Sequence, residues 1–215
     1  MTAVERLVQD AAALAVALSQ ADALRLLSLA EELSRWNRRT NLTAIRPEQM
    51  ATHHLLDSLA IHGELTGRRI ADAGTGAGFP GLPLALVNPQ REFTLIDATA
   101  KKLRFVEHAA KLLGLSNVTA VHGRVEALPG RPTFDTVLAR AFAPLPKLLA
   151  AVAPLCTSAT RVLAMKGRWP EKELHALPPG WRVSGSRRLE VPGLGAERCV
   201  IALSRAGAVA APSSP

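Results

Sequence analysis

The fold of this chain is decided by the stretch Ile70-Ala71-Asp72-Ala73-Gly74-Thr75-Gly76-Ala77-Gly78-Phe79-Pro80-Gly81. The short apolar run that ends at Asp72 predicts a buried strand, and the glycines that follow predict a tight loop whose backbone can approach a ligand. Proline is favoured in the first turn of a helix, so a helix is expected to start near Pro80. A strand, a glycine loop and a helix in this order are typical of a cofactor site at the carboxyl end of a parallel strand.

Two cofactor patterns overlap in this loop, Gly76-x-Gly78-x-x-Gly81 and Gly74-x-Gly76-x-Gly78. The first is typical of dinucleotide binding, and the second, with Asp72 before it, is typical of S-adenosylmethionine binding. A carboxylate at the strand end can accept hydrogen bonds from the ammonium of a methionine moiety, whereas it would repel a pyrophosphate. The loop therefore favours S-adenosylmethionine, with a nicotinamide cofactor and a purely structural turn as the alternatives.

Short apolar runs alternate with helical stretches from residue 69 onward, which predicts a parallel sheet with right-handed crossovers. The last two runs are joined by turn residues without a helix between them, so they are expected to close the sheet as an antiparallel edge. The expected strands cover residues 69–73, 92–97, 118–122, 133–139, 161–165, 181–189 and 198–203, and the expected helices cover 81–87, 101–113 and 145–153.

The first third of the chain has helical periodicity, with Leu29, Leu33 and Trp36 at spacings i, i+4 and i+7. A further helix is expected over residues 48–59. We therefore predict an N-terminal helical extension over residues 1–66, a cofactor-binding domain over 67–205, and a disordered tail of small residues, serine and proline over 206–215.

The composition suits one domain with an appendage: the chain has 215 residues, of which 48% are hydrophobic. Its 26 basic and 18 acidic residues give a net charge of +8, which indicates a polyanionic partner, although codon bias could explain part of the arginine excess. No apolar run approaches the roughly 20 residues of a membrane span, and no basic segment precedes an apolar one as in an export signal. We expect a cytoplasmic protein without a membrane anchor.

The cysteines and histidines give no sign of a metal site. Cys156 and Cys199 form no CxxC pair, and the cluster of His53, His54 and Asp57 has too few ligands for zinc. We expect this cluster to serve as a structural cap or as a surface that faces RNA.

Two further positions are expected to hold the cofactor. Asp97 ends the second strand, where a carboxylate can bind both ribose hydroxyls, and the alternative role is a helix N-cap. Val125 and Glu126 follow the third strand, where a backbone N–H and a side chain can bind the adenine edge; the alternative for Glu126 is a solvated surface acid.

The fourth strand is followed by Arg140, at the sheet edge where ligands bind in open parallel sheets. The chain lacks the Asn/Asp-Pro-Pro-aromatic tetrad that acts on exocyclic amines, and it lacks a Pro-Cys pair after this strand. Guanine N7 carries a lone pair and no proton, so its methylation needs alignment and no general base. Arg140 is expected to position a phosphate or the guanine O6, and its alternative role is a surface ion pair.

Two basic segments are expected to contact RNA. Arg38 and Arg39 lie in a turn without acidic residues, and Lys166 and Arg168 follow the fifth strand. Arginine forks match phosphate oxygens and stack on bases.

Several segments together resemble one bacterial family. In order, they are Asn41-Leu42-Thr43-Ala44-Ile45, His54-Leu55-Leu56-Asp57-Ser58-Leu59, the glycine loop, Arg124-Val125-Glu126, Ala139-Arg140-Ala141 and Met165-Lys166-Gly167. From about residue 33 to 203 the chain resembles the small-subunit ribosomal RNA methyltransferase family RsmG, also called GidB. The joint occurrence of the first three segments is the most specific part of this resemblance.

The resemblance implies a class I S-adenosylmethionine-dependent methyltransferase domain, with a Rossmann-like, doubly wound, mostly parallel seven-stranded sheet. It implies guanine N7 methylation of small-subunit (16S) ribosomal RNA, with the RNA or the 30S particle as partner. We also expect a monomer. By the same resemblance, Gly74, Phe79, Val125, Glu126 and Arg140 match cofactor-site positions, and Asp97, Ala98 and Thr99 lie at the ribose-binding turn. The family more often has larger or polar residues where Ala98 and Ala100 stand.

Two other classes of function remain open. A small-molecule methyltransferase would need a hydrophobic lid, and the arginine-rich extension favours RNA instead. A non-catalytic RNA-binding module would not need the intact cofactor loop.

Overall fold

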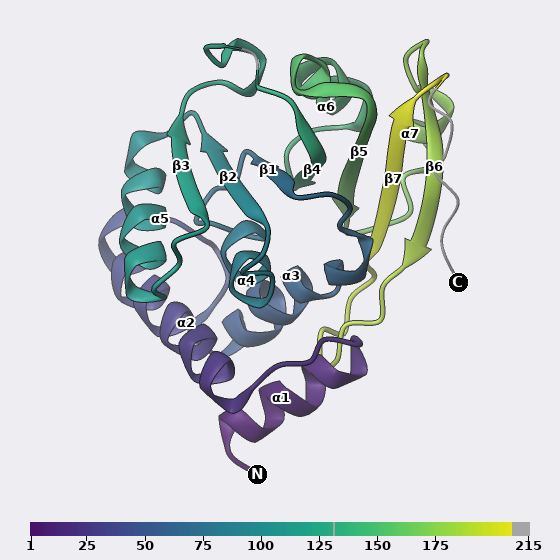
Figure 1. Cartoon of the computed structure of the whole chain (residues 1–215). Helices are drawn as coiled ribbons and strands as arrows, with labels where there is room; N and C mark the ends of the chain where they lie inside the picture. The colour runs from purple at the N-terminus through teal and green to yellow at the C-terminus, as the bar shows by residue number, and fades with distance from the viewer. Residues whose placement is uncertain (131, 208–215) are drawn as a thin grey trace.

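The computed structural model describes residues 1–130 and 132–207. Its centre is a seven-stranded sheet in the order β3-β2-β1-β4-β5-β7-β6, which Figure 1 shows from β3 on the left to β6 on the right. The strands are β1 (Arg69–Ala73), β2 (Glu92–Asp97), β3 (Val118–His122), β4 (Phe134–Arg140), β5 (Cys156–Lys166), β6 (Trp181–Arg188) and β7 (Cys199–Arg205).

The sheet is parallel from β3 to β5, and β7 runs antiparallel to both β5 and β6. The predicted doubly wound sheet with an antiparallel edge is therefore confirmed. Chain order reverses between β1 and β4, which brings the carboxyl ends of these two strands side by side. This reversal is the position where open α/β sheets bind ligands.

Helices cover both faces of the sheet. One hydrophobic core joins the N-terminal helices, α4 and α5 to one face, and a second core joins α6 to the other face. Figure 1 shows α1, α2 and α4 gathered toward the end of the molecule that carries the N-terminus. The helices are α1 (Ala3–Ala13), α2 (Gln20–Thr40), α3 (Asp57–Leu59), α4 (Gly81–Val87), α5 (Ala100–Leu112), α6 (Leu145–Val152) and α7 (Glu171–His175).

The N-terminal helices are part of the main core. Leu26, Leu29 and Leu33 of α2 are fully buried, and the Trp36 ring meets the Phe105 ring of α5 edge-on at 5.5 Å. A boundary between residues 66 and 67 stays a prediction, because one apolar core runs across it. Of the predicted tail, Ala206 and Gly207 form a turn, and residues 208–215 lie outside the described residues.

Two of the expected elements differ by more than two residues from the sequence-based expectation. The predicted helix over residues 48–59 is divided into a 3-10 turn (Pro47–Gln49), a π-helical stretch (Ala51–Leu56) and α3. Strand β5 begins five residues earlier than expected, because the Thr160 hydroxyl donates to the carbonyl of Phe134 and extends the pairing past a register shift.

Candidate functional site

Asp72, the acid at the end of β1, is fully buried beneath the glycine loop. Its Oδ2 accepts hydrogen bonds from the Thr75 hydroxyl at 2.6 Å and from the backbone N–H of Gly81 at 2.9 Å. Within the described part of the chain its Oδ1 has no hydrogen-bond partner. Burial raises the pKa of this carboxyl to about 6, although the two hydrogen bonds oppose the shift. An unpaired, buried carboxylate oxygen is a position that a cationic ligand group would satisfy.

The three loop glycines differ in what surrounds the position of a Cβ atom. A Cβ on Gly74 would lie 2.5 Å from the Phe142 ring, and a Cβ on Gly78 would lie 2.3 Å from the Leu82 side chain. A side chain at either position would displace a neighbouring side chain, and the positive φ of Gly74 (+67°) and Gly78 (+88°) would strain it. Gly76 has a φ of +60° and no atom within 4 Å of its Cβ position, so its side faces open space. That space is what a ligand that lies against the loop backbone would fill.

Asp97, at the end of β2, holds the loop from the other side. Its Oδ2 accepts from the backbone N–H of Gly76 at 2.9 Å, and its Oδ1 accepts from the backbone N–H of Thr99 at 2.8 Å. The N-cap residue of α5 is Thr99, so the capping alternative for Asp97 is not what the structure has. Each carboxylate oxygen retains a lone pair for a ribose hydroxyl.

A cavity of about 300 Å³ opens at this edge of the sheet. Five of the predicted cofactor residues line it: Gly74, Asp97, Ala98, Val125 and Glu126. The six others do not line it, and they are Asp72, Gly76, Gly78, Phe79, Thr99 and Arg140. Phe79 is instead buried, with its ring stacked on the His54 ring at 4.5 Å. The acidic ends of β1 and β2, the open side of Gly76 and the turn after β3 together fit S-adenosylmethionine.

Arg140 lies at the end of β4 and is held by the N-terminal extension. Its Nη1 donates to Asp57 Oδ2 at 3.0 Å and to the carbonyl of His53 at 3.1 Å, and its Nη2 lies 3.1 Å from His54 Nδ1. The Asp57 side chain is only 3% exposed, so the surface ion pair that was the alternative role is wrong. Arg140 also stands over the Phe79 ring at 5.6 Å.

A second cavity, of about 370 Å³, adjoins the first. Arg140, Arg198, Lys166 and His53 line it, and Ala141 lines both cavities. Ala141 has a φ of +51°, a left-handed conformation that costs energy for a residue with a Cβ and that is found at functional sites. The two cavities thus meet at the carboxyl end of β4.

The contacts of His54, Asp57 and Arg198 differ from what the sequence indicated. The cluster of His53, His54 and Asp57 had been expected as a cap or as a surface that faces RNA, and the structure buries His54 and Asp57 against Arg140. Arg198 donates to Asp57 Oδ1 at 2.9 Å. No local pattern marks Arg198, because its partner lies 141 residues away.

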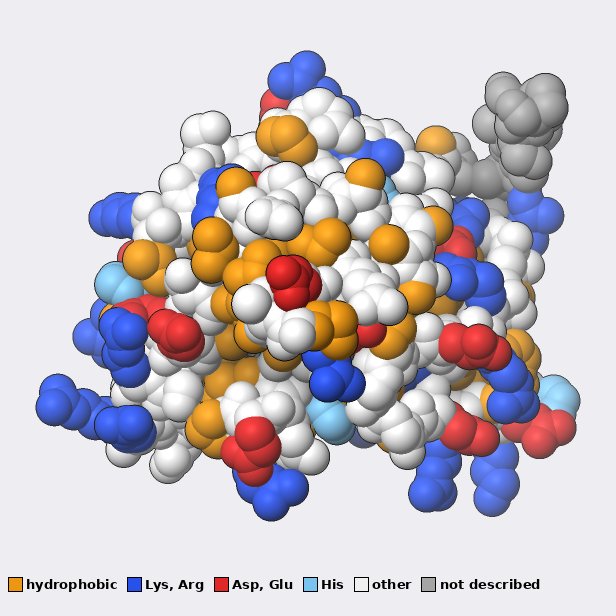
Figure 2. Space-filling view, turned by 90° about the horizontal axis from the view of Figure 1, so that it is seen from below, with side chains coloured by type: hydrophobic (Ala, Val, Ile, Leu, Met, Phe, Trp, Pro, Cys, Tyr) orange, Lys and Arg blue, Asp and Glu red, His pale blue; other side chains and the backbone are white. Residues whose placement is uncertain are grey.

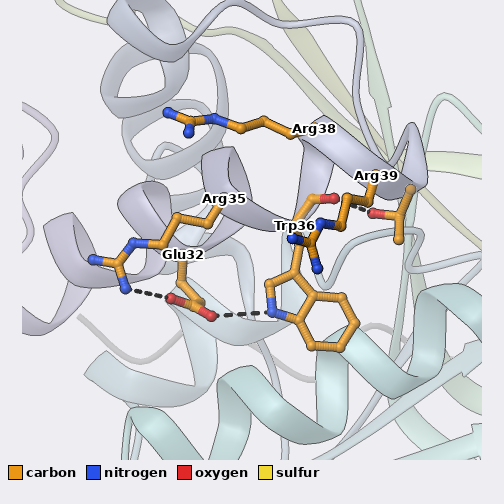
Figure 3. A pocket seen from close by; sticks show the side chains of 6 residues that line it. Glu32, Arg35, Trp36, Arg38 and Arg39 are labelled. Atoms are coloured by element: carbon orange, nitrogen blue, oxygen red, sulfur yellow. Dashed lines mark hydrogen bonds and ion pairs between the residues drawn. The ribbon is translucent and has the colours of Figure 1, made fainter.

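The predicted RNA-binding arginines lie at the end of α2, around a cavity of about 530 Å³. Figure 3 shows Arg35, Glu32 and Trp36 joined by hydrogen bonds, with Arg38 extended away from the indole. Within residues 1–130 and 132–207, Arg38 and Arg39 have no side-chain partner, and both are exposed. Their positive charges are therefore available to phosphate groups.

The last turn of α2 lies toward the cofactor edge. Arg25, near the start of α2, donates to the carbonyl of Leu113 at the end of α5, whereas Trp36 packs on Phe105 and His108 further back along α5. The two helices are therefore antiparallel. Because α5 begins directly after the ribose-binding turn, the Arg38 end of α2 and that turn face the same side of the molecule.

The two basic residues of the second predicted RNA segment have different surroundings in the structure. Lys166 Nζ donates to Glu173 Oε2 at 2.7 Å and to the carbonyl of Ala143 at 3.0 Å, so its charge is already neutralised. Arg168 is exposed and forms no side-chain ion pair within the described residues. We therefore expect Arg168 to contribute more to polyanion binding than Lys166.

Charge alone does not locate an RNA surface. Figure 2 looks at the face that carries α1, and it shows basic side chains spread around the rim with hydrophobic side chains near the centre.

In the described part of the chain, no helix is long and apolar enough to cross a membrane. No group of three or more His, Cys, Asp and Glu side chains there could hold a metal ion.

The sheet order, the glycine loop and the acids at the ends of β1 and β2 define a class I S-adenosylmethionine-dependent methyltransferase. Solved structures of this fold are similar: a SAM dependent methyltransferase from Aquifex aeolicus matches 83% of this chain and 98% of its own, at a TM-score of 0.53 and 21% identity. TrmN from Thermus thermophilus matches 79% of this chain and 53% of its own, at a TM-score of 0.54 and 24% identity.

The chain belongs to the GidB family, rRNA small subunit methyltransferase G, whose model matches residues 22–201. The Ribosomal RNA small subunit methyltransferase G of Methylococcus capsulatus is 50% identical over 85% of this chain and 89% of its own. The protein of the same name from Saccharophagus degradans is 45% identical over 94% of this chain and 91% of its own. The predicted family, fold class and cofactor are thereby confirmed.

Proposed function

We propose that this chain transfers a methyl group from S-adenosylmethionine to N7 of a guanosine in small-subunit (16S) ribosomal RNA. The observation that carries the proposal is the meeting of two cavities at Ala141, one lined by the cofactor turns and one lined by arginines. Family membership supports the ribosomal RNA as substrate.

Groups at the carboxyl ends of β1, β2 and β3 hold the cofactor. Asp72 Oδ1 is the acceptor for the methionine ammonium, Asp97 binds the ribose, and the turn of Val125 and Glu126 binds the adenine edge. Gly76 provides the open side along which the cofactor lies. When bound, S-adenosylmethionine supplies a methyl group on a positively charged sulfur.

The second cavity holds the target guanine. Arginine is the usual partner of the guanine major-groove edge, which carries the O6 and N7 acceptors. Arg140 and Arg198 bind O6 or the phosphate of the target nucleotide, and neither guanidinium faces N7, because N7 becomes positively charged. Since N7 has no proton to lose, the chain aligns the reacting atoms and supplies no general base.

The RNA lies across the edge that carries both cavities and reaches the end of α2. Arg38, Arg39 and Arg168 bind its phosphates. We expect a monomer in the cytoplasm that acts on the RNA or on the 30S particle.

Incubation of the protein with S-adenosylmethionine labelled in its methyl group tests the proposal. Naked 16S RNA, 30S particles and a metabolite extract are supplied in separate reactions. We expect label in RNA from at least one of the first two reactions. Label in a metabolite alone would favour a small-molecule methyltransferase, and no label with normal RNA binding would favour a non-catalytic module.

A further inference from the structure

Asp57 is a buried acid of the extension that binds two arginines from separate parts of the methyltransferase domain. Its Oδ2 accepts from Arg140 Nη1 at 3.0 Å, and its Oδ1 accepts from Arg198 Nε at 2.9 Å. The side chains of Arg140 and Arg198 are 19% and 22% exposed, and both line the second cavity. One carboxylate thus determines the position of both guanidinium groups.

His54 fixes Arg140 further, and it does so as a neutral ring. Burial, the positive charge of Arg140 and His53 lower the pKa of His54 to about 3. A guanidinium only donates, so His54 Nδ1 accepts from Arg140, and the ring proton is on Nε2. That N–H donates to the Thr43 hydroxyl oxygen at 2.9 Å.

The bonds from the extension leave part of the Arg140 fork unused. Arginine has five N–H donors, and three of those of Arg140 are used by Asp57, His54 and the carbonyl of His53. The remaining donors belong to a group that cannot rotate freely and that lines the cavity. A pre-oriented fork is the arrangement that recognises guanine or phosphate in two contacts.

We propose that Asp57 is a positioning residue for methyl transfer, which holds Arg140 and Arg198 side by side so that their free N–H groups bind the target guanosine. This inference rests on the proposed function. Without the carboxylate, two like charges would stand together in a half-buried cavity and would move apart. Loss of Asp57 would then reduce turnover through geometry, and it would not affect cofactor binding.

A double-mutant cycle tests whether Asp57 acts through Arg140. The variants are Asp57→Asn, Arg140→Gln and the two together, assayed at saturating cofactor. We expect Asp57→Asn to lower kcat roughly 10- to 100-fold, with the KM for RNA and the affinity for S-adenosylhomocysteine within about threefold of the wild type. The double variant should be no more than about threefold slower than Arg140→Gln. Losses that multiply would show that Asp57 acts independently of Arg140 and would overturn the proposal.

Glu64 provides a matched control. It also comes from the N-terminal segment and also binds two arginines, Arg161 at 2.7 Å and Arg187 at 3.2 Å, but it lines neither cavity. Glu64→Gln should lower the unfolding temperature by an amount similar to Asp57→Asn and should leave kcat within about threefold. Equal losses of kcat in the two variants would mean that Asp57 has a structural role alone.

A readout without RNA separates this inference from the proposed function. In ¹⁵N NMR spectra of the arginine side chains, guanidinium groups that are held in place give resolved signals. Asp57→Asn should remove the resolved signals of Arg140 and Arg198, and Glu64→Gln should remove those of Arg161 and Arg187. Unchanged Arg140 and Arg198 signals in Asp57→Asn would overturn the inference, whereas a wild-type protein that methylates no RNA would overturn the proposed function.

Discussion

Asp72 accepts a hydrogen bond from the backbone N–H of Gly81 at 2.9 Å, so the acid at the end of β1 fixes the first residue of α4. One carboxylate oxygen shapes the loop, while the other has no partner in the described residues. The same residue therefore both builds the loop and offers a site for a cation.

This relationship predicts a pH dependence of cofactor binding. The pKa of Asp72 is raised from 3.8 to about 6 by burial, so its charged form is lost as the pH falls through 6. Because the ligand ammonium needs the carboxylate, the affinity for S-adenosylhomocysteine should fall by roughly tenfold per pH unit below that pKa. Calorimetry between pH 5 and 8 measures this slope.

Asp72→Asn is the control for this prediction. The amide cannot ionise, so affinity should be low at pH 8 and should change little down to pH 5. A wild-type affinity that stays constant across the same range would show that the ammonium does not pair with Asp72. The stability of the fold has the opposite pH dependence. Because the pKa of Asp72 is raised in the folded state, its contribution makes the unfolding free energy fall as the pH rises from about 4 to 6.

The open side of Gly76 predicts a variant that folds but does not bind. In Gly76→Val the side chain would enter the space along the loop backbone, and we expect S-adenosylhomocysteine binding to be lost. Gly180→Val is the matched control, because Gly180 also has a positive φ and no atom within 4 Å of its Cβ position. Both variants should lose similar stability, so unchanged binding by Gly76→Val would place the cofactor elsewhere.

RNA binding should depend on salt through the end of α2. For single-stranded RNA, log affinity should fall against log salt by roughly 0.7 for each phosphate contact. Replacement of Arg38 and Arg39 by glutamine should reduce this slope by about 1.4 and leave cofactor affinity unchanged. The control replaces Arg6 and Arg68 by glutamine, which removes the same net charge. Arg6 forms an ion pair with Asp10, and Arg68 forms one with Glu92. Equal slopes in the two double variants would place the RNA on another face.

The sequence predicted the parts of the fold that depend on local pattern. The bounds of β1, β2, β3 and α4 agree with the prediction, because apolar runs and glycines mark where each element begins and ends. The predicted cofactor turns at Asp97 and Val125 also come together, since parallel strands place their carboxyl ends at one edge.

Contacts between distant residues could not be predicted in this way. The bond between Arg140 and Asp57 joins residues 83 apart, and the bond between Arg198 and Asp57 joins residues 141 apart. Lys166 had been expected to face RNA because it follows a strand, but Glu173 of α7, seven residues further on, neutralises its charge. These pairs depend on which faces pack together, and hydrophobic periodicity does not contain that information.

Substitution of His53 tests whether the reaction proceeds without a general base. Its side chain lines the second cavity, and its Nδ1 is buried without a partner in the described residues, so it is the strongest candidate for a proton acceptor. We expect His53→Gln to lower kcat less than tenfold, because removal of a general base costs roughly 100- to 10,000-fold. The kcat of the wild type should show no inflection between about pH 6 and 9. A larger loss of kcat, together with a wild-type inflection that His53→Gln removes, would assign His53 as a base.

Chemical cleavage of the product RNA tests the central claim most directly. Borohydride followed by aniline cleaves RNA at N7-methylguanosine, so RNA that this protein has methylated should be cut at one guanosine, and RNA incubated without S-adenosylmethionine should stay intact. Product RNA that carries the labelled methyl group but resists cleavage would place the methyl group on another atom and would contradict methyl transfer without a general base.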